Sequence, residues 1–126
     1  MKLGILSDSH TKSTYQNEAI NRLKDFDVSY LIHAGDLCLE ENLKSLEDSK
    51  IPYISVFGNN DYSLLGLDSK YNIKKEPYYF KIKNIKVLTD LEDRTSGVKA
   101  LYPDGYWMFF RASKTEMGIF RIIVNG

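Results

Sequence analysis

The sequence lacks the features that would place the protein in a membrane or outside the cell. It has one cysteine, Cys38, so no disulfide can form within the chain. No apolar run reaches the roughly 18 residues that a membrane-spanning helix needs. The short apolar run at the N-terminus stops at Asp8 and lacks the cleavage site of a signal peptide. We therefore expect a cytoplasmic protein that does not contact a membrane.

A net charge is also absent, because 17 Lys and Arg residues balance 17 Asp and Glu residues. The two halves differ: residues 1–69 carry a net charge of −5, and residues 70–126 carry +5. The basic half is either a solvated lysine-rich face or a surface that steers an anionic ligand. Zero overall charge and the absence of an aromatic–basic motif argue against a nucleic-acid-binding module.

The composition is that of a folded globular protein. Hydrophobic residues make up 43% of the chain and charged residues 27%, which excludes a disordered or fibrous protein. A chain of 126 residues is long enough for one hydrophobic core. No repeat, low-complexity segment or linker divides the sequence, so we expect residues 1–126 to form a single domain.

The first 60 residues alternate between strand and helix patterns. Apolar runs of strand length occupy residues 2–7, 28–33 and 53–57, and each is followed by a polar cluster. Helical spacing of apolar residues predicts helices over 13–26 and 40–49. Strands that are apolar throughout are typical of a parallel sheet covered on both faces. This half therefore predicts a βαβαβ unit with a parallel sheet.

The details of the two helices follow from the same spacing. In the first helix, Ser13 and Gln16 fit a capping box at the N-terminus. The side chains expected to point inward are Ala19, Ile20, Leu23 and Phe26 in the first helix, and Leu43 and Leu46 in the second.

The second half predicts mainly strands. A hairpin is expected from strands at 78–83 and 85–89 with a turn at Asn84, because Phe80 and Ile82 alternate with lysines. The segments "GYWMFFRAS" and "GIFRIIV" predict two further strands. The chain is thus of the α/β class, a parallel βαβαβ half followed by a mostly β half.

Polar side chains gather where the three parallel strands end. In an open α/β sheet, ligands bind outside the carboxyl ends of the strands, so we expect these side chains to converge. Carboxylates suit hard divalent cations, and metals such as Mn, Fe, Ni and Zn also accept imidazole. The residues are Asp8, His10, Asp36, Asn59 and Asp61.

Each of these residues has an expected role. Asp8 and His10 can point at one ion, Asp36 has two oxygens with which to bridge two ions, and Asn59 offers a neutral carbonyl to the second ion. Asp61 is better placed to orient a ligand than to bind metal. Two ions about 3.5–4 Å apart would clamp a phosphate and activate a bound water. The alternative is that Asp8 and Asn59 only cap helices or form turns.

Two neighbouring residues receive structural interpretations instead. His33 precedes the turn at Gly35, and we interpret it as a structural histidine with satisfied hydrogen bonds. Cys38 is interpreted as a small buried hydrophobic residue.

The motifs "SDSH", "HAGDL" and "GNND" resemble, in order and spacing, the first three motifs of the calcineurin-like metallophosphoesterases. The resemblance is greatest to the small bacterial and archaeal phosphodiesterase branch. It implies that Asp8 and His10 bind the first metal, that Asp36 bridges and that Asn59 binds the second metal, with Asp61 behind them. It also implies a shortened form of that fold, a two-sheet α/β sandwich with flanking helices.

The resemblance weakens after the third motif. Family members carry further histidine ligands, whereas here no histidine follows His33, and Asp90 in "LTDL" stands where a histidine is expected. "YPDG" (102–105) resembles a turn that follows the missing histidine motif. That alignment makes residues 111–126 the closing hairpin and implies that a block between Asp90 and Tyr102 has been lost.

Two hypotheses follow. The first is a metal-dependent hydrolase that uses Asp36, Asn59 and Asp61 in catalysis and up to two divalent ions. Its substrate would be a phosphodiester or small phosphomonoester, and Mn²⁺ is the expected ion, with Ni, Fe, Zn or Mg as alternatives. The second is a catalytically degenerate scaffold that binds a protein partner or another copy of itself. Its contact surface would be "YPDGYWMFF", where Trp107 is an interface-type residue, unless this stretch is a plain core strand.

Overall fold

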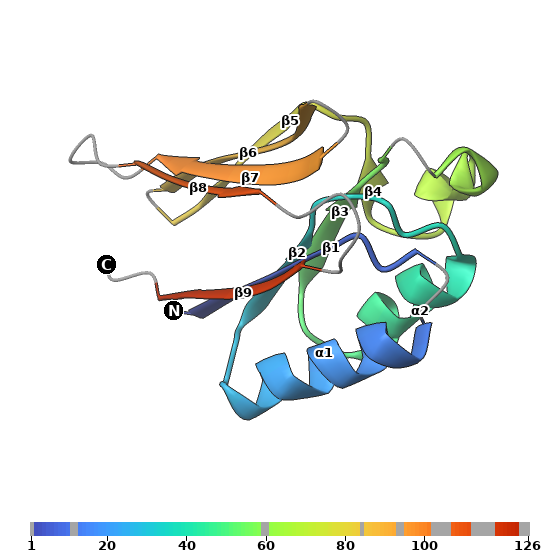
Figure 1. The fold of residues 1–126 in the computed structure, drawn as a ribbon, viewed down its shortest axis with the longest axis horizontal. Coiled ribbons are helices and arrows are strands. Elements are labelled where there is room, and N and C mark those ends of the chain that lie inside the picture. The colour runs from blue at the N-terminus through green and yellow to red at the C-terminus, as the bar shows by residue number, and fades with distance from the viewer. Residues whose placement is uncertain are drawn as a thin grey trace.

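The computed structural model describes residues 2–10, 13–58, 61–83, 85–92, 95–101, 107–111 and 118–123. Within these ranges the side chains are described except those of 90–92, 95–97, 107–111 and 118–123. Within these residues, two sheets and two α-helices form three layers, with the helices on one face of the larger sheet and the smaller sheet on the other (Figure 1).

The larger sheet contains the parallel strands that the sequence predicts. Its strand order is β4-β3-β2-β1-β9, in which β1 to β4 are parallel and β9 is antiparallel to β1. Where the structure describes them, the predicted strands of this sheet begin and end within two residues of the expected positions. The strands are β1 (Lys2–Ser7), β2 (Tyr30–His33), β3 (Tyr53–Val56), β4 (Ile73–Lys74) and β9 (Gly118–Ile123).

Helices α1 (Ser13–Asp25) and α2 (Glu40–Asp48) bury their apolar faces against this sheet. The expected inward side chains are buried, with one exception: Phe26 is 47% exposed because α1 ends one residue earlier. The capping-box interpretation is also wrong, since the side chain of Gln16 is fully buried and bonds to Asn42 and Ser45 of α2.

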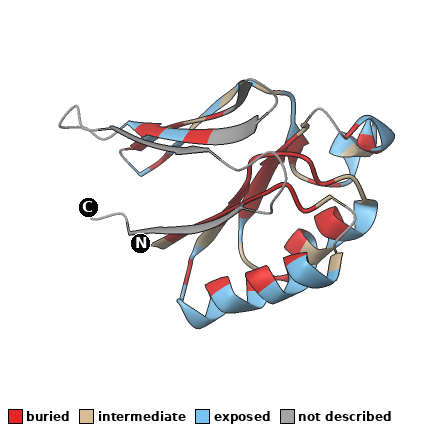
Figure 2. Cartoon of the chain, viewed as in Figure 1, coloured by how far each residue is buried: buried red, intermediate tan, exposed pale blue. Residues whose placement is uncertain are grey.

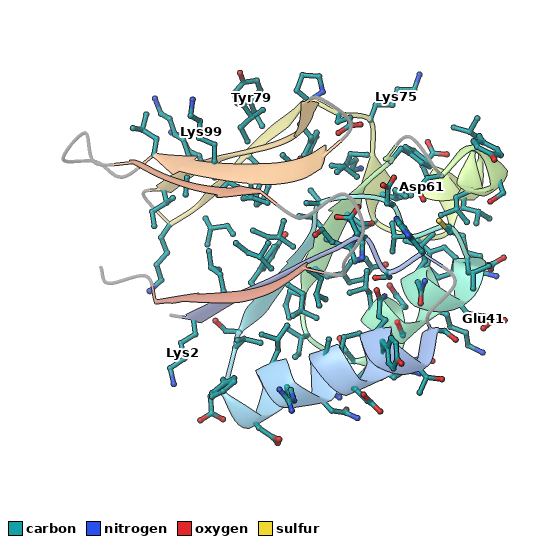
Figure 3. All side chains as sticks on the ribbon, viewed as in Figure 1. Lys2, Glu41, Asp61, Lys75, Tyr79 and Lys99 are labelled. Atoms are coloured by element: carbon teal, nitrogen blue, oxygen red, sulfur yellow. The ribbon has the colours of Figure 1, made fainter. Side chains whose placement is uncertain are left out.

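The smaller sheet is an antiparallel meander. Its strands β5, β6, β7 and β8 pair in chain order. The expected hairpin is confirmed as β5 and β6. Tyr79 and Lys99 point away from the larger sheet (Figure 3). The strands are β5 (Tyr78–Ile82), β6 (Ile85–Glu92), β7 (Thr95–Leu101) and β8 (Trp107–Arg111), and two 3₁₀ turns, η1 (Tyr62–Leu64) and η2 (Leu67–Ser69), precede β4.

Two apolar clusters fill the spaces between the layers (Figure 2). One lies between the helices and the larger sheet and includes Leu6, Leu23 and Leu31; the other lies between the sheets and includes Ile5 and Ile32. Strand β1 contributes to both clusters because successive side chains point to opposite faces. Burial on both faces explains why the parallel strands are apolar throughout.

The expectation of a closing hairpin is wrong. Strand β8 pairs with β7 in the smaller sheet, whereas β9 pairs with β1 in the larger one, so the two strands belong to different sheets. The segment between Asp90 and Tyr102, where a lost block was expected, contributes β7 to the meander. Among the described residues, no helix is long and apolar enough to cross a membrane.

Candidate metal centre

Two loops run side by side at the carboxyl edge of the larger sheet. The backbone N–H of Asp8 donates to the carbonyl of Gly35 at 2.9 Å, and that of His10 donates to the carbonyl of Asp36 at 3.0 Å. These bonds continue the pairing of β1 with β2 beyond the strand ends. They bring the first and second sequence motifs into contact.

The backbone of these loops is strained. Among the described residues of these loops, four other than glycine have left-handed φ angles: 56° at Asp8, 50° at His10, 61° at Asp36 and 62° at Cys38. Asp and His tolerate this region better than most residues, yet each such position costs of order 1–3 kcal/mol. Strain of this kind persists only where surrounding contacts hold it, and it is concentrated at functional sites.

The strained loops place three potential ligands together. His10 Nε2 lies 3.7 Å from Asp8 Oδ1 and 3.6 Å from Asp36 Oδ2. One ligand atom from each of the three residues lies within 4.8 Å of the others. Both carboxylates are buried, and the His10 side chain is 33% exposed. The cluster is therefore shielded on the protein side and reachable from solvent past the imidazole.

The electrostatics of the cluster fit a divalent cation. Burial, together with the neighbouring Asp36 carboxyl, raises the pKa of Asp8 to about 7. Among the described residues, neither Asp8 Oδ2 nor His10 Nε2 has a hydrogen-bond partner, although both atoms are buried. Buried polar atoms without partners cost about 1–3 kcal/mol each. A cation bound between these atoms would supply the missing interaction and favour ionised Asp8.

Asp61, which follows β3 (Figure 3), accepts hydrogen bonds from the loop that carries Asp36. Its Oδ2 accepts the backbone N–H of Asp36 and of Gly58, each at 2.8 Å, and its Oδ1 accepts that of Cys38 at 2.7 Å. Both carboxylate oxygens are thus engaged by backbone groups. Asp61 has the geometry of a residue that orients the loop of Asp36.

Gly58 packs directly against Asp36. A Cβ atom at this position would lie 2.2 Å from Asp36 Oδ1 and 2.4 Å from its backbone nitrogen. Since only glycine leaves room there, the loop after β3 and the loop after β2 can approach closely. The close approach brings the third sequence motif to the cluster.

The two remaining expected ligands are not placed by the structure. Asn59 lies outside the described residues, as does the side chain of Asp90. The backbone of Asp90 lies in β6 and pairs with Gly97 of β7. The expected contact surface "YPDGYWMFF" likewise falls outside the described side chains, including Trp107.

His33 is a structural histidine, as interpreted from the sequence. It is fully buried, its Nδ1 accepts the backbone N–H of Gly35 at 3.2 Å, and its Nε2 lies 2.8 Å from Ser9 Oγ. Because Nδ1 accepts, the proton of the neutral ring resides on Nε2, which donates to Ser9. Burial lowers the pKa of His33 to about 3. Cys38 is only partly buried, unlike the expectation for it.

A buried polar network below the cluster was not anticipated from the sequence. Ser9 Oγ donates to Gln16 Oε1, and Gln16 Nε2 donates to the carbonyl of Asn42 at 2.6 Å. Both Gln16 and Asn42 are fully buried. The helical pattern of the sequence could have indicated the burial of Gln16, because this residue lies on the same apolar stripe of α1 as Ala19, Ile20 and Leu23. A polar residue on such a stripe needs buried partners.

Comparisons with known proteins identify the family and the fold. A sequence model described as the calcineurin-like phosphoesterase superfamily domain matches residues 1–105. A curated relative, phosphodiesterase MJ0936 of Methanocaldococcus jannaschii, is 36% identical over 61 residues, which is 48% of this chain and 37% of the relative. The chain thus matches little more than a third of that protein's length.

A solved structure has a similar fold. It comes from work titled "Structural and Functional Characterization of a Novel Archaeal Phosphodiesterase". The superposition has a TM-score of 0.57 at 17% identity and covers 89% of this chain and 100% of the other. The similarity confirms the expected fold class.

Proposed function

The chain belongs to the calcineurin-like phosphoesterase superfamily, and from that premise we propose that it is a metal-dependent hydrolase of phosphate esters. The observation that carries the proposal is the cluster of Asp8, His10 and Asp36, in which two buried ligand atoms have no hydrogen-bond partner among the described residues. The substrate class is a phosphodiester or a small phosphomonoester. Water activated by metal would be the nucleophile.

The residues of the cluster divide the work in this proposal. Asp8 and His10 would hold a first divalent ion, and Asp36 would offer a carboxylate oxygen to each of the two ions. When bound, such ions lower the pKa of a coordinated water and neutralise charge on the phosphate. Asp61 holds the backbone of Asp36 through its N–H, and His10 forms the solvent side of the site.

The second ion depends on weaker ligands. Asn59 would offer a neutral amide oxygen, and Asp90 would take the place of a histidine. Mn²⁺ is the proposed ion because a site with two carboxylates and one imidazole suits it, although Ni, Fe, Zn and Mg can bind the same donor types. Substrate phosphate would supply the further ligands that a second ion needs and that the protein alone does not provide.

Hydrolysis assays test the proposal. The purified protein should hydrolyse bis(p-nitrophenyl) phosphate or p-nitrophenyl phosphate when Mn²⁺ is added and should stop when the metal is chelated. Asp36→Asn should abolish turnover, and Asp68→Asn, the same change at an exposed residue, should leave it unchanged. Absence of turnover with every one of the five metals would overturn the proposal.

A further inference from the structure

Asn42 of α2 connects the two ligand-bearing loops. Its side chain is fully buried, and Nδ2 donates to the carbonyl of His10 at 2.9 Å and to the carbonyl of Leu37 at 2.7 Å. His10 belongs to the first loop, and Leu37 directly follows Asp36 in the second. One amide group therefore uses both of its hydrogens to join the loops.

The orientation of this amide is determined by its partners. Both are backbone carbonyls, which only accept hydrogen bonds, so the nitrogen of Asn42 and not its oxygen must face them. Asn42 Oδ1 is buried and has no hydrogen-bond partner among the described residues. An unpartnered buried oxygen destabilises the fold. Asn42 therefore stabilises the structure through the two hydrogen bonds that its nitrogen donates to the loops.

The loops need such a contact because their backbones are strained. Both His10 and Asp36 have left-handed φ angles, and relaxation of either would move a side chain of the cluster. Asn42 is held in turn from below, where its own carbonyl accepts bonds from Gln16 Nε2 at 2.6 Å and Ser45 Oγ at 2.8 Å. Through Asn42, helix α2 fixes the positions of both loops.

We propose that Asn42 is a positioning residue that sets the separation of His10 and Asp36 and thereby the affinity of the site for its metal. This inference rests on the proposed function, because it takes the cluster to be a metal site. Asn42 touches none of the ligand atoms itself. Its effect passes through the backbone of the two loops, as with other groups that orient metal ligands from behind.

Metal titration of variants tests the inference. Asn42→Leu keeps the branched shape of the side chain and removes both donated bonds, and Asn42→Ser leaves a hydroxyl that can reach at most one loop. Asn21→Leu is the matched control, since it makes the same change at an exposed residue of α1. The probe is Mn²⁺ alone, added to metal-free protein and followed by calorimetry, with circular dichroism to identify the folded variants.

We expect the Mn²⁺ dissociation constant to rise about 10–100-fold in the folded Asn42 variants, the range known for residues that orient ligands. Asn21→Leu should stay within about two-fold of wild type. Excess Mn²⁺ should restore the turnover of the Asn42 variants, which loss of folding would not allow. Wild-type affinity in either folded Asn42 variant would overturn the inference, and absence of Mn²⁺ binding by wild type would instead overturn the proposed function.

Discussion

The carboxylate of Asp61 accepts the backbone N–H of Asp36 at 2.8 Å, and this bond ties the loop after β3 to the loop that carries the central ligand. The same carboxylate also accepts the N–H groups of Gly58 and Cys38. The three hydrogen bonds that this buried carboxylate accepts fix the strained loop of Asp36. The position of the Asp36 carboxylate therefore depends on Asp61.

Replacement of Asp61 by asparagine should damage both folding and metal binding. The amide presents an NH₂ group to backbone N–H donors, so at least one hydrogen bond to a charged acceptor is lost, at about 1.5–3 kcal/mol. We expect the free energy of unfolding to fall by about that amount and Mn²⁺ affinity to fall with it. Urea unfolding and Mn²⁺ titration measure the two effects. Unchanged Mn²⁺ affinity in Asp61→Asn would show that Asp61 does not orient Asp36.

Gly58→Ala should have a similar effect by a steric route. The new methyl group would overlap the carboxylate and backbone of Asp36, and overpacking of this kind costs about 1–3 kcal/mol. Gly66→Ala is the control, because Gly66 has a φ of 93° but no atom within 4 Å of a Cβ. The control should lose stability from backbone strain alone and keep wild-type Mn²⁺ affinity. Equal Mn²⁺ affinities in the two variants would contradict the close packing of Gly58 on Asp36.

His33 should make the protein sensitive to acid. Its pKa is about 3 in the folded protein and 6.5 in the unfolded chain, so the unfolded chain alone takes up a proton as the pH falls below 6.5. The contribution of neutral His33 to the free energy of unfolding is fully present above pH 6.5. It is lost as the pH falls toward 3, at up to about 1.4 kcal/mol per pH unit. His33→Gln should remove this slope. The check is the difference in unfolding free energy between variant and wild type at pH 7 and at pH 4.5; a difference that does not change with pH would refute it.

Asp8 should produce the opposite dependence in metal-free protein. Its folded pKa of about 7 exceeds the reference value of 3.8, so its contribution to stability is present below pH 3.8 and is lost as the pH rises through 7. A metal needs the ionised carboxylate, so protons compete with it. The rise in melting temperature caused by Mn²⁺ should therefore be larger at pH 8 than at pH 5.5. An equal rise at both values would argue against Asp8 as a ligand.

Much of the first half could be predicted from local sequence patterns. Apolar runs of strand length, amphipathic helices and the polar clusters after each strand determine the βαβαβ order, and the topology then brings Asp8, His10 and Asp36 to one edge. The left-handed φ angles of these residues could not be predicted from residue type, because Asp and His are also found in turns with ordinary φ angles. It arises from bonds between loops that are 25 or more residues apart.

The second half was harder because strand pairing there is not local. The pattern of "GIFRIIV" indicates a strand but not its partner, which is β1 at the other end of the chain (Figure 1). The segment 95–101 contains Gly97 and three polar residues, so its pattern gives no clear strand signal for β7. Asn42 was missed for a similar reason, since only the tertiary structure shows which carbonyls face a buried amide.

Anomalous diffraction tests directly whether Asp8, His10 and Asp36 bind a metal. Crystals grown with Mn²⁺ should show an anomalous peak between Asp8, His10 and Asp36, and a weaker second peak beside Asp36 would mark the bridged ion. In Asp36→Asn crystals grown in the same way, the peaks should disappear. Wild-type crystals at saturating Mn²⁺ without a peak at this cluster would contradict the account.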